Sequence, residues 1–419
     1  MALMLNSAAM PTFSVIIPTR NRARTLREAI PTVLAQTDGD LEVIVQDNAS
    51  PDDTRAVVLS FDDPRIVYRR SDHPLSMHDN WAAALEAARG EWIIVIGDDD
   101  ALLPDACAQA KKIIAATGAR LLTWVAAVYG WPCHDAPEFR NMVQVLLGDG
   151  WEEISCRQVL EELYTRRRGW IGAPSIYHGF VHRSVIDTAR GRAGGRYFFD
   201  LQPDIGATLT NLFCAKEYVK SLEPLSIAGW SRGSNGGRGQ TPEAMRAMLK
   251  RLAAEAGQTI ESWTVLSDTR LAGMETMMLG TLANVRITLG ISADSDAAPP
   301  VPADERSVLR CVMRDPGGIS VPFDEWKQAI LEHAERLEME IDPATLVLPP
   351  APRHHAGFSA DGEGYLRQIR LDAGRLGCNS LGDAVQRIAA ILRNYRVNPA
   401  AVRSSLWPVD PVLRRGQCL

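Results

Sequence analysis

The sequence predicts an α/β fold with a mostly parallel sheet, helices on both of its faces, and an all-helical region at the C-terminal end. The first observation is that short apolar runs alternate with helical patterns in the N-terminal part of the chain. The second is that after residue 238 only helical patterns and linkers follow. Continuous apolar strands separated by helices are typical of a parallel sheet that is covered on both faces.

The first strands and helices can be read in order. The runs expected to form strands are 13–17, 41–45, 66–68 and 92–96. A helix is expected over 26–35, and Pro31 inside it should kink or split it. Ser50, followed by Pro51 and Asp53, predicts the start of a second helix. Asp79 predicts the start of a third, which ends at Gly90.

The rest of the chain is divided by changes in pattern. A strand is expected over 175–181 and a helix over 206–214. Residues 10–238 then form the catalytic unit, with halves at 10–125 and 126–238. Residues 239–419 form the helical region, with linkers near 291–304 and 342–357.

Composition limits the classes of protein. The chain has 419 residues, 46% hydrophobic and 23% charged, with a net charge of −6. These values are typical of a globular protein, and the acidic balance argues against nucleic-acid binding. The cysteines number seven and stand singly, and the N-terminus lacks a basic segment ahead of its apolar residues. We therefore expect a reduced cytoplasmic protein, with peripheral contact to the inner face of the membrane left open.

Polar residues follow three of the predicted strands. Thr19, Arg20 and Arg22 follow the first, Asp47 follows the second, and the triplet 98–100 (Asp-Asp-Asp) follows the fourth. The carboxyl ends of parallel strands meet at one edge, where ligands bind in such sheets. Adjacent carboxylates repel one another, and a hard divalent cation relieves that repulsion. The pattern predicts a site for Mg²⁺ or Mn²⁺ and a diphosphate.

These segments, taken in order, resemble the nucleotide-binding half of family 2 glycosyltransferases of the GT-A fold over about residues 12–125. The matching segments read SVIIPTRNRARTLREAI, EVIVQDNASPDD and NWAAALEAARGEWIIVIGDDDALLPD. The resemblance implies that Pro18, Thr19, Arg20 and Arg22 line the nucleotide-sugar pocket. It also implies that Asp47 accepts a hydrogen bond from N3–H of uracil or thymine.

The acidic triplet corresponds to the DxD region of that family. Aligned on Leu103-Pro104-Asp105, Gly97 stands where many members have their first Asp. The resemblance therefore implies that Asp98 lies near the ribose and diphosphate, with Asp99 as the favoured metal ligand and Asp100 as a second candidate. The alternative is that the triplet only caps the following helix.

The catalytic base is expected in the second half of the domain. An inverting transferase needs a carboxylate that takes the proton of the acceptor hydroxyl. Asp204 follows a proline at a predicted helix start and is preferred over Asp200. The alternative is that Asp204 is only a helix cap.

A glycine-rich stretch, 229–237, has the composition of a mobile loop. Trp230 could cover a sugar and Arg232 could meet the diphosphate when the loop closes. A plain surface turn is the alternative. His178 and His182 are interpreted as structural residues of the strand near 175–181.

The sequence thus predicts an enzyme that transfers a sugar, with inversion, from a UDP- or dTDP-linked donor to a hydroxyl acceptor. The acceptor would be a glycan, a lipid-linked molecule or another hydroxyl compound. The helical region is expected to bind acceptor, form a homo-oligomer or dock on a membrane. One alternative is an inactive partner or scaffold protein. Another is a sugar nucleotidyltransferase, which would want a glycine-rich basic signature after the first strand, where PTRNRARTL has no glycine.

Overall fold

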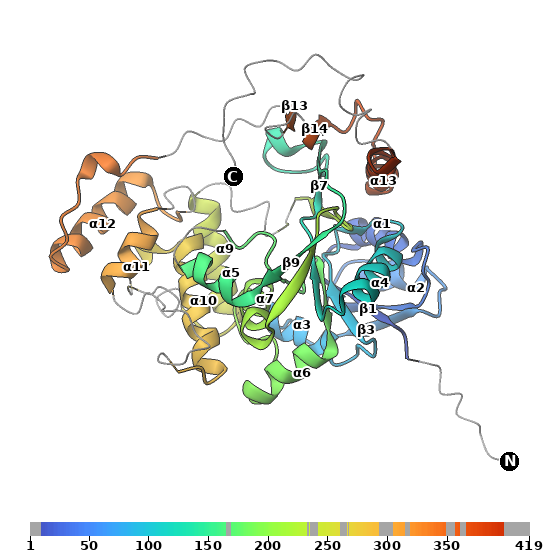
Figure 1. Ribbon diagram of the computed structural model, residues 1–419, viewed down its shortest axis with the longest axis horizontal. Coiled ribbons are helices and arrows are strands. Elements are labelled where there is room, and N and C mark those ends of the chain that lie inside the picture. Colours follow the sequence, from blue (N-terminus) through green and yellow to red (C-terminus); the bar gives the residue numbers. More distant parts are fainter. Residues whose placement is uncertain are drawn as a thin grey trace.

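The structure is a computed structural model, and it describes most of the chain. The described residues are 10–164, 169–232, 234, 242–259, 266, 268–292, 305–314, 319–348, 357–360 and 366–397. Strands occupy the middle of the molecule, and helices α9 to α12 gather on the opposite side from α1, α2 and α4 (Figure 1).

The larger sheet has eight strands in the order β3-β2-β1-β4-β10-β6-β11-β9. Their bounds are β1 Phe13–Thr19, β2 Leu41–Asp47, β3 Ile66–Arg70, β4 Trp92–Val95, β6 Leu121–Thr123, β9 Trp151–Ser155, β10 Gly179–His182 and β11 Glu217–Ser221. The first four of these strands in chain order are parallel to one another, whereas β10 runs antiparallel to β4. The predicted α/β fold with a mostly parallel sheet is confirmed, and the antiparallel strand β10 makes the sheet a mixed one. Thr19 pairs with Asp47 in the register, so the polar ends of β1 and β2 lie side by side.

Helices cover both faces of this sheet. Their bounds are α1 Ala23–Leu34, α2 Thr54–Leu59, α3 Met77–Leu85, α4 Ala106–Thr117, α5 Cys156–Tyr164, α6 Arg183–Arg192 and α7 Pro203–Cys214. Alternate residues of β1 point to opposite faces, as a period of two requires. Val15 and Ile17 pack in a cluster with α1 and α4, whereas Ile16 packs in the cluster on the other face.

Several predicted helix starts are wrong by a few residues. Helix α2 begins after Asp53, because the Ser50 hydroxyl accepts from the backbone N–H of Asn21 instead of capping a helix. Helix α3 begins earlier than expected, and Ser76 is its N-cap. Helix α1 continues through Pro31 without a break.

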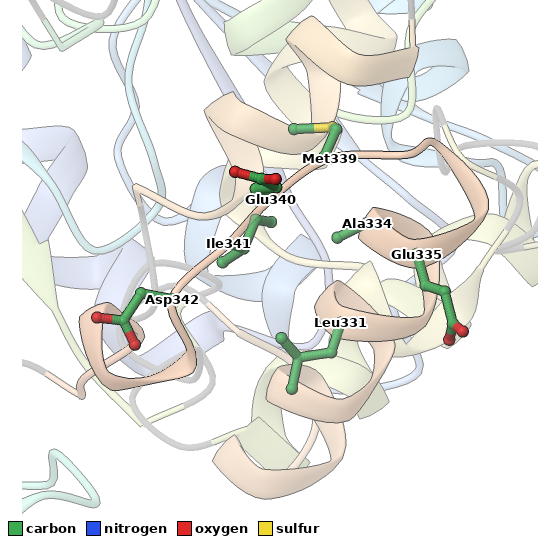
Figure 2. Close-up of a pocket in the computed structure, with 7 residues that line it drawn as sticks. All are labelled: Leu331, Ala334, Glu335, Met339, Glu340, Ile341 and Asp342. Carbon is green, nitrogen blue, oxygen red and sulfur yellow. The ribbon is translucent and has the colours of Figure 1, made fainter.

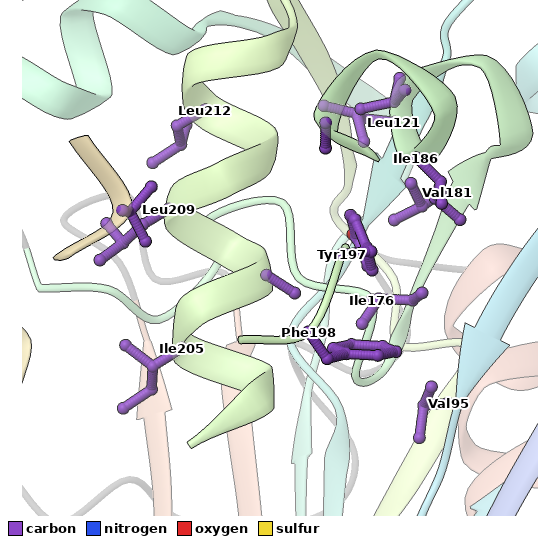
Figure 3. Close-up of a cluster of buried hydrophobic side chains, with 14 of the residues drawn as sticks. Val95, Leu121, Ile176, Val181, Ile186, Tyr197, Phe198, Ile205, Leu209 and Leu212 are labelled. Carbon is purple, nitrogen blue, oxygen red and sulfur yellow. The ribbon is translucent and has the colours of Figure 1, made fainter. Parts of the chain in front are cut away.

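Helix α7 anchors the second half of this domain. Ile205, Leu209 and Leu212 recur along one side of it and belong to the buried cluster that also contains Phe198 and Ile176 (Figure 3). This packing fixes the N-terminal turn of α7, where Asp204 lies.

A second sheet of six strands stands beside the first, in the order β13-β14-β8-β7-β12-β5. Its strands are β5 Ala101–Leu102, β7 Ala127–Gly130, β8 Met142–Leu146, β12 Ser226–Trp230, β13 Gly357–Ala360 and β14 Leu366–Asp372. The prediction of an all-helical C-terminal region is therefore wrong in part, because β13 and β14 are strands. Strand β14 pairs antiparallel with β8, and helix α13 (Leu381–Val397) packs on the same sheet, beside α1. The partner of β14 lies far away in the sequence, so no pattern close to β14 predicts that this segment forms a strand.

The remaining helices form two smaller cores. They are α9 Pro242–Glu255, α10 Met274–Thr288, α11 Glu305–Val312 and α12 Phe323–Arg336. Trp326 is fully buried among α11 and α12 residues, and Leu201 packs with α9 and with Met277 of α10. The predicted linker at 291–304 lies almost wholly outside the described residues, and that at 342–357 does so from residue 349 to 356. No helix in the described part of the chain has both the length and the apolar character needed to span a bilayer.

Candidate active site

The polar residues after β1 and β4 meet at the carboxyl edge of the parallel strands. The Thr19 hydroxyl donates to Asp98 Oδ2 at 2.7 Å, and both side chains are buried. The pairing of β1 with β4 brings these residues together from positions far apart in the chain. The predicted convergence of these two clusters is what the structure shows.

Arg22 bridges two carboxylates of the triplet. Its Nε donates to Asp98 Oδ1 at 2.9 Å, and its Nη2 donates to Asp99 Oδ2 at 2.6 Å. Burial disfavours the charged guanidinium, but the two carboxylates outweigh burial and raise the pKa of Arg22. Arg22 is therefore the internal counter-cation of the acidic triplet.

One arginine does not neutralise the whole triplet. Burial raises the pKa of Asp99 to about 7 despite the neighbouring guanidinium, and the charges of Asp100 and Asp98 add to that rise. Burial also raises the pKa of Asp98, against the attraction of Arg22. Two carboxylates whose ionisation is disfavoured form an electrostatic environment that favours added positive charge.

Asp100 is held differently from its two neighbours. Its Oδ1 accepts from the Gly229 backbone N–H at 2.7 Å, and its Oδ2 accepts from the Tyr177 hydroxyl at 2.6 Å and from the Gly97 N–H. Burial alone would raise the pKa of Asp100, but His178 and these hydrogen bonds hold it below its usual value. Asp100 is thus an ionised anchor whose oxygens face the protein.

Tyr177 and His178 were not predicted as site residues. His178 Nε2 lies 3.2 Å from Asp100 Oδ2, and its Nδ1 lies 2.8 Å from Ser226 Oγ. His178 precedes β10, with a positive φ of 56°, instead of lying within a strand as expected. Strands β10 and β4 run in opposite directions, so the start of β10 lies beside the end of β4. That antiparallel pairing was the missing signal.

The side chain of Asp47 is fully buried at the end of β2. It accepts hydrogen bonds from Tyr68 OH at 2.7 Å, Arg70 Nη1 at 3.0 Å and the Ser50 N–H at 2.8 Å. Arg70 is the exposed member of this group. The Arg70 guanidinium thus occupies Oδ2 of a carboxylate whose side chain is 0% exposed.

The other predicted nucleotide residues lie around the same edge, with varied partners. Pro18 lies in β1, half-buried, and Arg20 is exposed and pairs with Glu255 at 3.2 Å. Trp230 ends β12 and packs edge-on against Phe139 with ring centroids 5.0 Å apart.

The end of β12 contacts the triplet through backbone and hydroxyl groups. Ser231 Oγ donates to Asp99 Oδ2 at 2.6 Å, and Arg22 Nη1 donates to the carbonyl oxygen of Arg232 at 2.8 Å. The Arg232 guanidinium instead binds Asp135 at 3.0 Å, away from the triplet. Ser231 is a further site neighbour that sequence reasoning missed. Part of the predicted loop, residues 233 and 235–237, lies outside the described residues.

The two candidate bases occupy different surroundings. Asp204 is half-buried in the first turn of α7, where burial raises its pKa against the opposing effect of backbone N–H groups. Its charge also contributes to the raised pKa of Tyr177, after burial and the charges of Asp100 and Asp99. The hydroxyl on which this charge acts is the one that donates to Asp100 Oδ2. Asp200 is 1% exposed, and both of its carboxylate oxygens accept hydrogen bonds from α10.

The chemistry of Asp98 and Asp99 indicates whether a divalent cation suits this site. Carboxylate oxygens of Asp98 and Asp99 are the hard ligands that Mg²⁺ and Mn²⁺ prefer, and their raised pKa values favour a cation. Both oxygens of Asp98 and both oxygens of Asp100 already accept hydrogen bonds, so a cation that used either residue would have to displace one of these donors. Within the described ranges no group of three or more His, Cys, Asp or Glu side chains forms a complete metal site. The residues fit a cation that shares its remaining coordination positions with substrate oxygens.

A cavity of about 540 Å³ lies elsewhere, beside the end of α12 (Figure 2). Leu331, Ala334 and Glu335 of α12 and the segment Met339–Asp342 line it. Figure 1 places α12 on the opposite side of the molecule from α1, so this cavity is separate from the acidic triplet.

An α/β domain that gathers buried carboxylates and an arginine at the carboxyl ends of parallel strands belongs to the class of nucleotide-binding enzyme domains. Residues 14–150 match the family model described as Glycosyl transferase family 2. This segment of the chain is therefore similar to the members of glycosyltransferase family 2.

Curated relatives also match a part of the chain. It is 42% identical over 100 residues to the GalNAc(5)-diNAcBac-PP-undecaprenol beta-1,3-glucosyltransferase of Campylobacter jejuni, covering 23% of this chain and 32% of that protein. It is 33% identical over 112 residues to the succinoglycan biosynthesis protein ExoO of Rhizobium meliloti, covering 27% of this chain and 32% of that protein. The matched segment spans about a third of the length of these relatives.

Solved structures also resemble the chain. A crystal structure of S. aureus TarS 1-349 in complex with UDP-GlcNAc aligns with 92% of this chain and 92% of its own, at 14% identity and a TM-score of 0.45.

Proposed function

We propose that this protein transfers a sugar from a nucleoside-diphosphate donor, UDP- or dTDP-linked, to a hydroxyl group of a glycan or lipid-linked acceptor. The observation that carries the proposal is the convergence of Thr19, Arg22, Asp98 and Asp99 at one strand edge within the family 2 segment. The printed functions of the relatives, a glucosyltransferase on a polyprenol-linked glycan and a succinoglycan biosynthesis protein, support glycoconjugate assembly.

The proposed reaction is a single displacement with inversion. The acceptor oxygen attacks the anomeric carbon, the bond between that carbon and the diphosphate oxygen breaks, and Asp204 takes the acceptor proton. Burial raises the pKa of Asp204, which suits a carboxylate that must hold a proton. Asp200 is not assigned this role because both of its oxygens already have partners.

The leaving group is a diphosphate, and its charge must be neutralised. Asp99, with Asp98 beside it, would hold Mn²⁺ or Mg²⁺, which supplies Lewis-acid stabilisation of the departing diphosphate. The Arg22 guanidinium forms ion pairs with the same two carboxylates and is the positively charged side chain at this position. We propose that Arg22 turns from the carboxylates toward the diphosphate when donor and metal bind.

The base-binding end of the proposed donor site is at β2. Asp47 would accept N3–H of uracil or thymine once Arg70 has moved from its carboxylate. Arg20, Trp230 and Arg232 remain candidates for the rim of this site, since they lie near the ends of β1 and β12.

The test is ligand-dependent stability. Thermal unfolding would be followed with UDP, dTDP, GDP and ADP, each with and without Mn²⁺, on the native protein and on Asp99→Ala. A ligand at a hundred times its dissociation constant stabilises the folded state by about 2.7 kcal/mol. A Mn²⁺-dependent rise with UDP or dTDP that Asp99→Ala abolishes supports the proposal.

Asp187→Asn is the matched control, because Asp187 is an exposed carboxylate on α6. It should respond to nucleotide as the native protein does. A well-folded native protein that no nucleotide stabilises would instead favour an inactive partner or scaffold protein.

A further inference from the structure

Asp200 is a buried carboxylate that links two elements of different parts of the chain. It lies three residues before α7, and it is 1% exposed. Its Oδ1 accepts from Thr281 Oγ1 at 3.0 Å, and its Oδ2 accepts from Asn284 Nδ2 at 3.1 Å. Both donors belong to α10, so Asp200 joins the N-terminal end of α7 to a helix of the C-terminal region.

Asp200 also lies directly against the first turn of α7. A Cβ atom placed on Gly206 would lie 2.6 Å from Asp200 Cβ, so only glycine permits this approach. Gly206 donates its backbone N–H to the carbonyl of Gln202, the N-cap residue of α7, at 2.9 Å. Asp204 lies in this same turn, and its charge acts on Asp200. Asp200 therefore packs against the turn that carries Asp204.

The surrounding interface between α7 and α10 is apolar. Leu282 and Val285 of α10, and its C-cap residue Leu289, belong to the buried cluster that contains Ile205, Leu209 and Leu212 of α7, which Figure 3 labels. Apolar contacts are non-directional, and they permit one helix to slide or rotate against another with small loss. A carboxylate that requires two donors at fixed positions allows only one register. A buried polar group of this kind costs desolvation, and its best-attested use is to fix such a register.

We propose that Asp200 is a positioning residue, which through Thr281 and Asn284 fixes the first turn of α7 on α10 and so holds Asp204 at the acceptor side of the active site. The inference rests on the proposed role of Asp204 as the base. It makes α10 a structural part of the catalytic machinery, although this helix follows the family 2 segment by more than a hundred residues.

The test exchanges the two partners. Asp200→Asn replaces one acceptor oxygen by an N–H₂ group, so a single oxygen is left for the two donors of α10. The double variant Asp200→Asn/Asn284→Asp restores a donor and acceptor pair with the polarity reversed. Two readouts are measured for the full chain. One is hydrogen–deuterium exchange of the peptide covering 204–208, and the other is UDP release from UDP-glucose with water as the acceptor.

We expect Asp200→Asn to speed exchange in the 204–208 peptide and to lower kcat by about 10- to 100-fold, with KM for UDP-glucose unchanged. The exchanged pair should restore both. Tyr197→Phe is the matched control, because it removes another buried hydrogen bond onto α7, from Tyr197 OH to Asn211 Oδ1 at 2.8 Å. That variant should lose stability with kcat unchanged.

Two results would overturn the inference. Unchanged exchange and unchanged kcat in Asp200→Asn would show that the link positions nothing. Exchange restored by the double variant without recovery of kcat would show that the Asp200 carboxylate takes part in the chemistry itself.

The proposed function can fail separately. If UDP-glucose neither stabilises nor is cleaved by the native protein, the donor assignment is lost, and the exchange measurement alone decides the link between Asp200 and α10.

Discussion

Arg22 Nη2 lies 2.6 Å from Asp99 Oδ2, in the position where a cation would neutralise the acidic triplet. The guanidinium also contacts Asp98 Oδ1 at 2.9 Å, so one side chain serves two buried carboxylates. Truncating one member of a buried, charged group leaves the others without compensation, and that cost exceeds the net stabilisation of the intact group.

Arg22→Gln should therefore destabilise the protein by about 3–5 kcal/mol, because it leaves Asp98 and Asp99 without their counter-charge. Mn²⁺ without nucleotide should then stabilise this variant more than the native protein, since the metal no longer competes with a guanidinium. Urea unfolding with and without Mn²⁺ measures both effects. Arg24→Gln, at an exposed position on α1, is the control. Equal stabilisation by Mn²⁺ of Arg22→Gln and native protein would show that Arg22 and the metal occupy different places.

Asp204→Asn should lower kcat by about 100-fold or more while the affinity for UDP stays unchanged, because the amide cannot take the acceptor proton. UDP release and UDP-dependent thermal stability measure the two quantities. The control is Asp187→Asn, an exposed carboxylate on α6. Activity of Asp204→Asn near the native rate would eliminate Asp204 as the base.

Tyr177→Phe should destabilise the protein by about 1.5–3 kcal/mol, the range for a hydrogen bond to a charged group. The lost bond is the one from Tyr177 OH to Asp100 Oδ2 at 2.6 Å. Tyr129→Phe is the matched control, because the buried Tyr129 hydroxyl has no hydrogen-bond partner in the described part of the chain. Denaturant unfolding of the two variants should separate them clearly; similar values would mean that the bond to Asp100 adds nothing to stability.

The stability difference between Asp200→Asn and the native protein should depend on pH. Burial raises the pKa of Asp200 to about 6 from the ordinary 3.8. The folded state thus holds this proton more tightly than the unfolded chain does. The proton on Asp200 therefore stabilises the folded state below about pH 4, and this stabilisation is lost as pH rises through about 6.

Asparagine stays neutral at every pH. The free energy of unfolding of Asp200→Asn should therefore rise relative to that of the native protein by roughly 3 kcal/mol between about pH 4 and about pH 6. Unfolding free energies measured at several pH values from 4 to 7 test this. A constant difference would mean that Asp200 titrates at its ordinary pKa.

Ile388→Ala should cost about 2–5 kcal/mol, because Ile388 is fully buried between α13 and the second sheet. Ile287→Ala removes the same atoms from a side chain that is 79% exposed, and it should change stability little. If unfolding becomes two separate transitions in Ile388→Ala, α13 stabilises a unit of its own and not the shared sheet.

The parts of the fold that local sequence determines were predictable. The polar residues Thr19 and Asp47 at the ends of β1 and β2, and Asp98 shortly after β4, could be placed because apolar runs end near them. Tyr177 and His178 could not, because their contact with Asp100 depends on an antiparallel pairing between distant segments. For the same reason β14 was missed: its partner β8 lies in another part of the chain.

Local sequence patterns could not predict the individual hydrogen bonds of the acidic triplet either. The sequence indicates three adjacent carboxylates, but their different pKa values depend on which oxygen meets Arg22, Ser231 or the Gly229 N–H. The roles proposed for Asp47, Asp99 and Asp204 remain predictions that the experiments above test.

The pairing of β14 with β8 also has a consequence for biosynthesis. Gln368 pairs with Leu146, so the second sheet stays incomplete while all of the intervening chain is translated. At about 5–20 residues per second, β8 waits roughly ten seconds or longer for its neighbour. During that interval β8 presents an unpaired edge, which is the kind of surface that associates with other chains and that chaperones protect. Slowed translation after β8 should therefore lower the yield of folded protein more than slowed translation before β1.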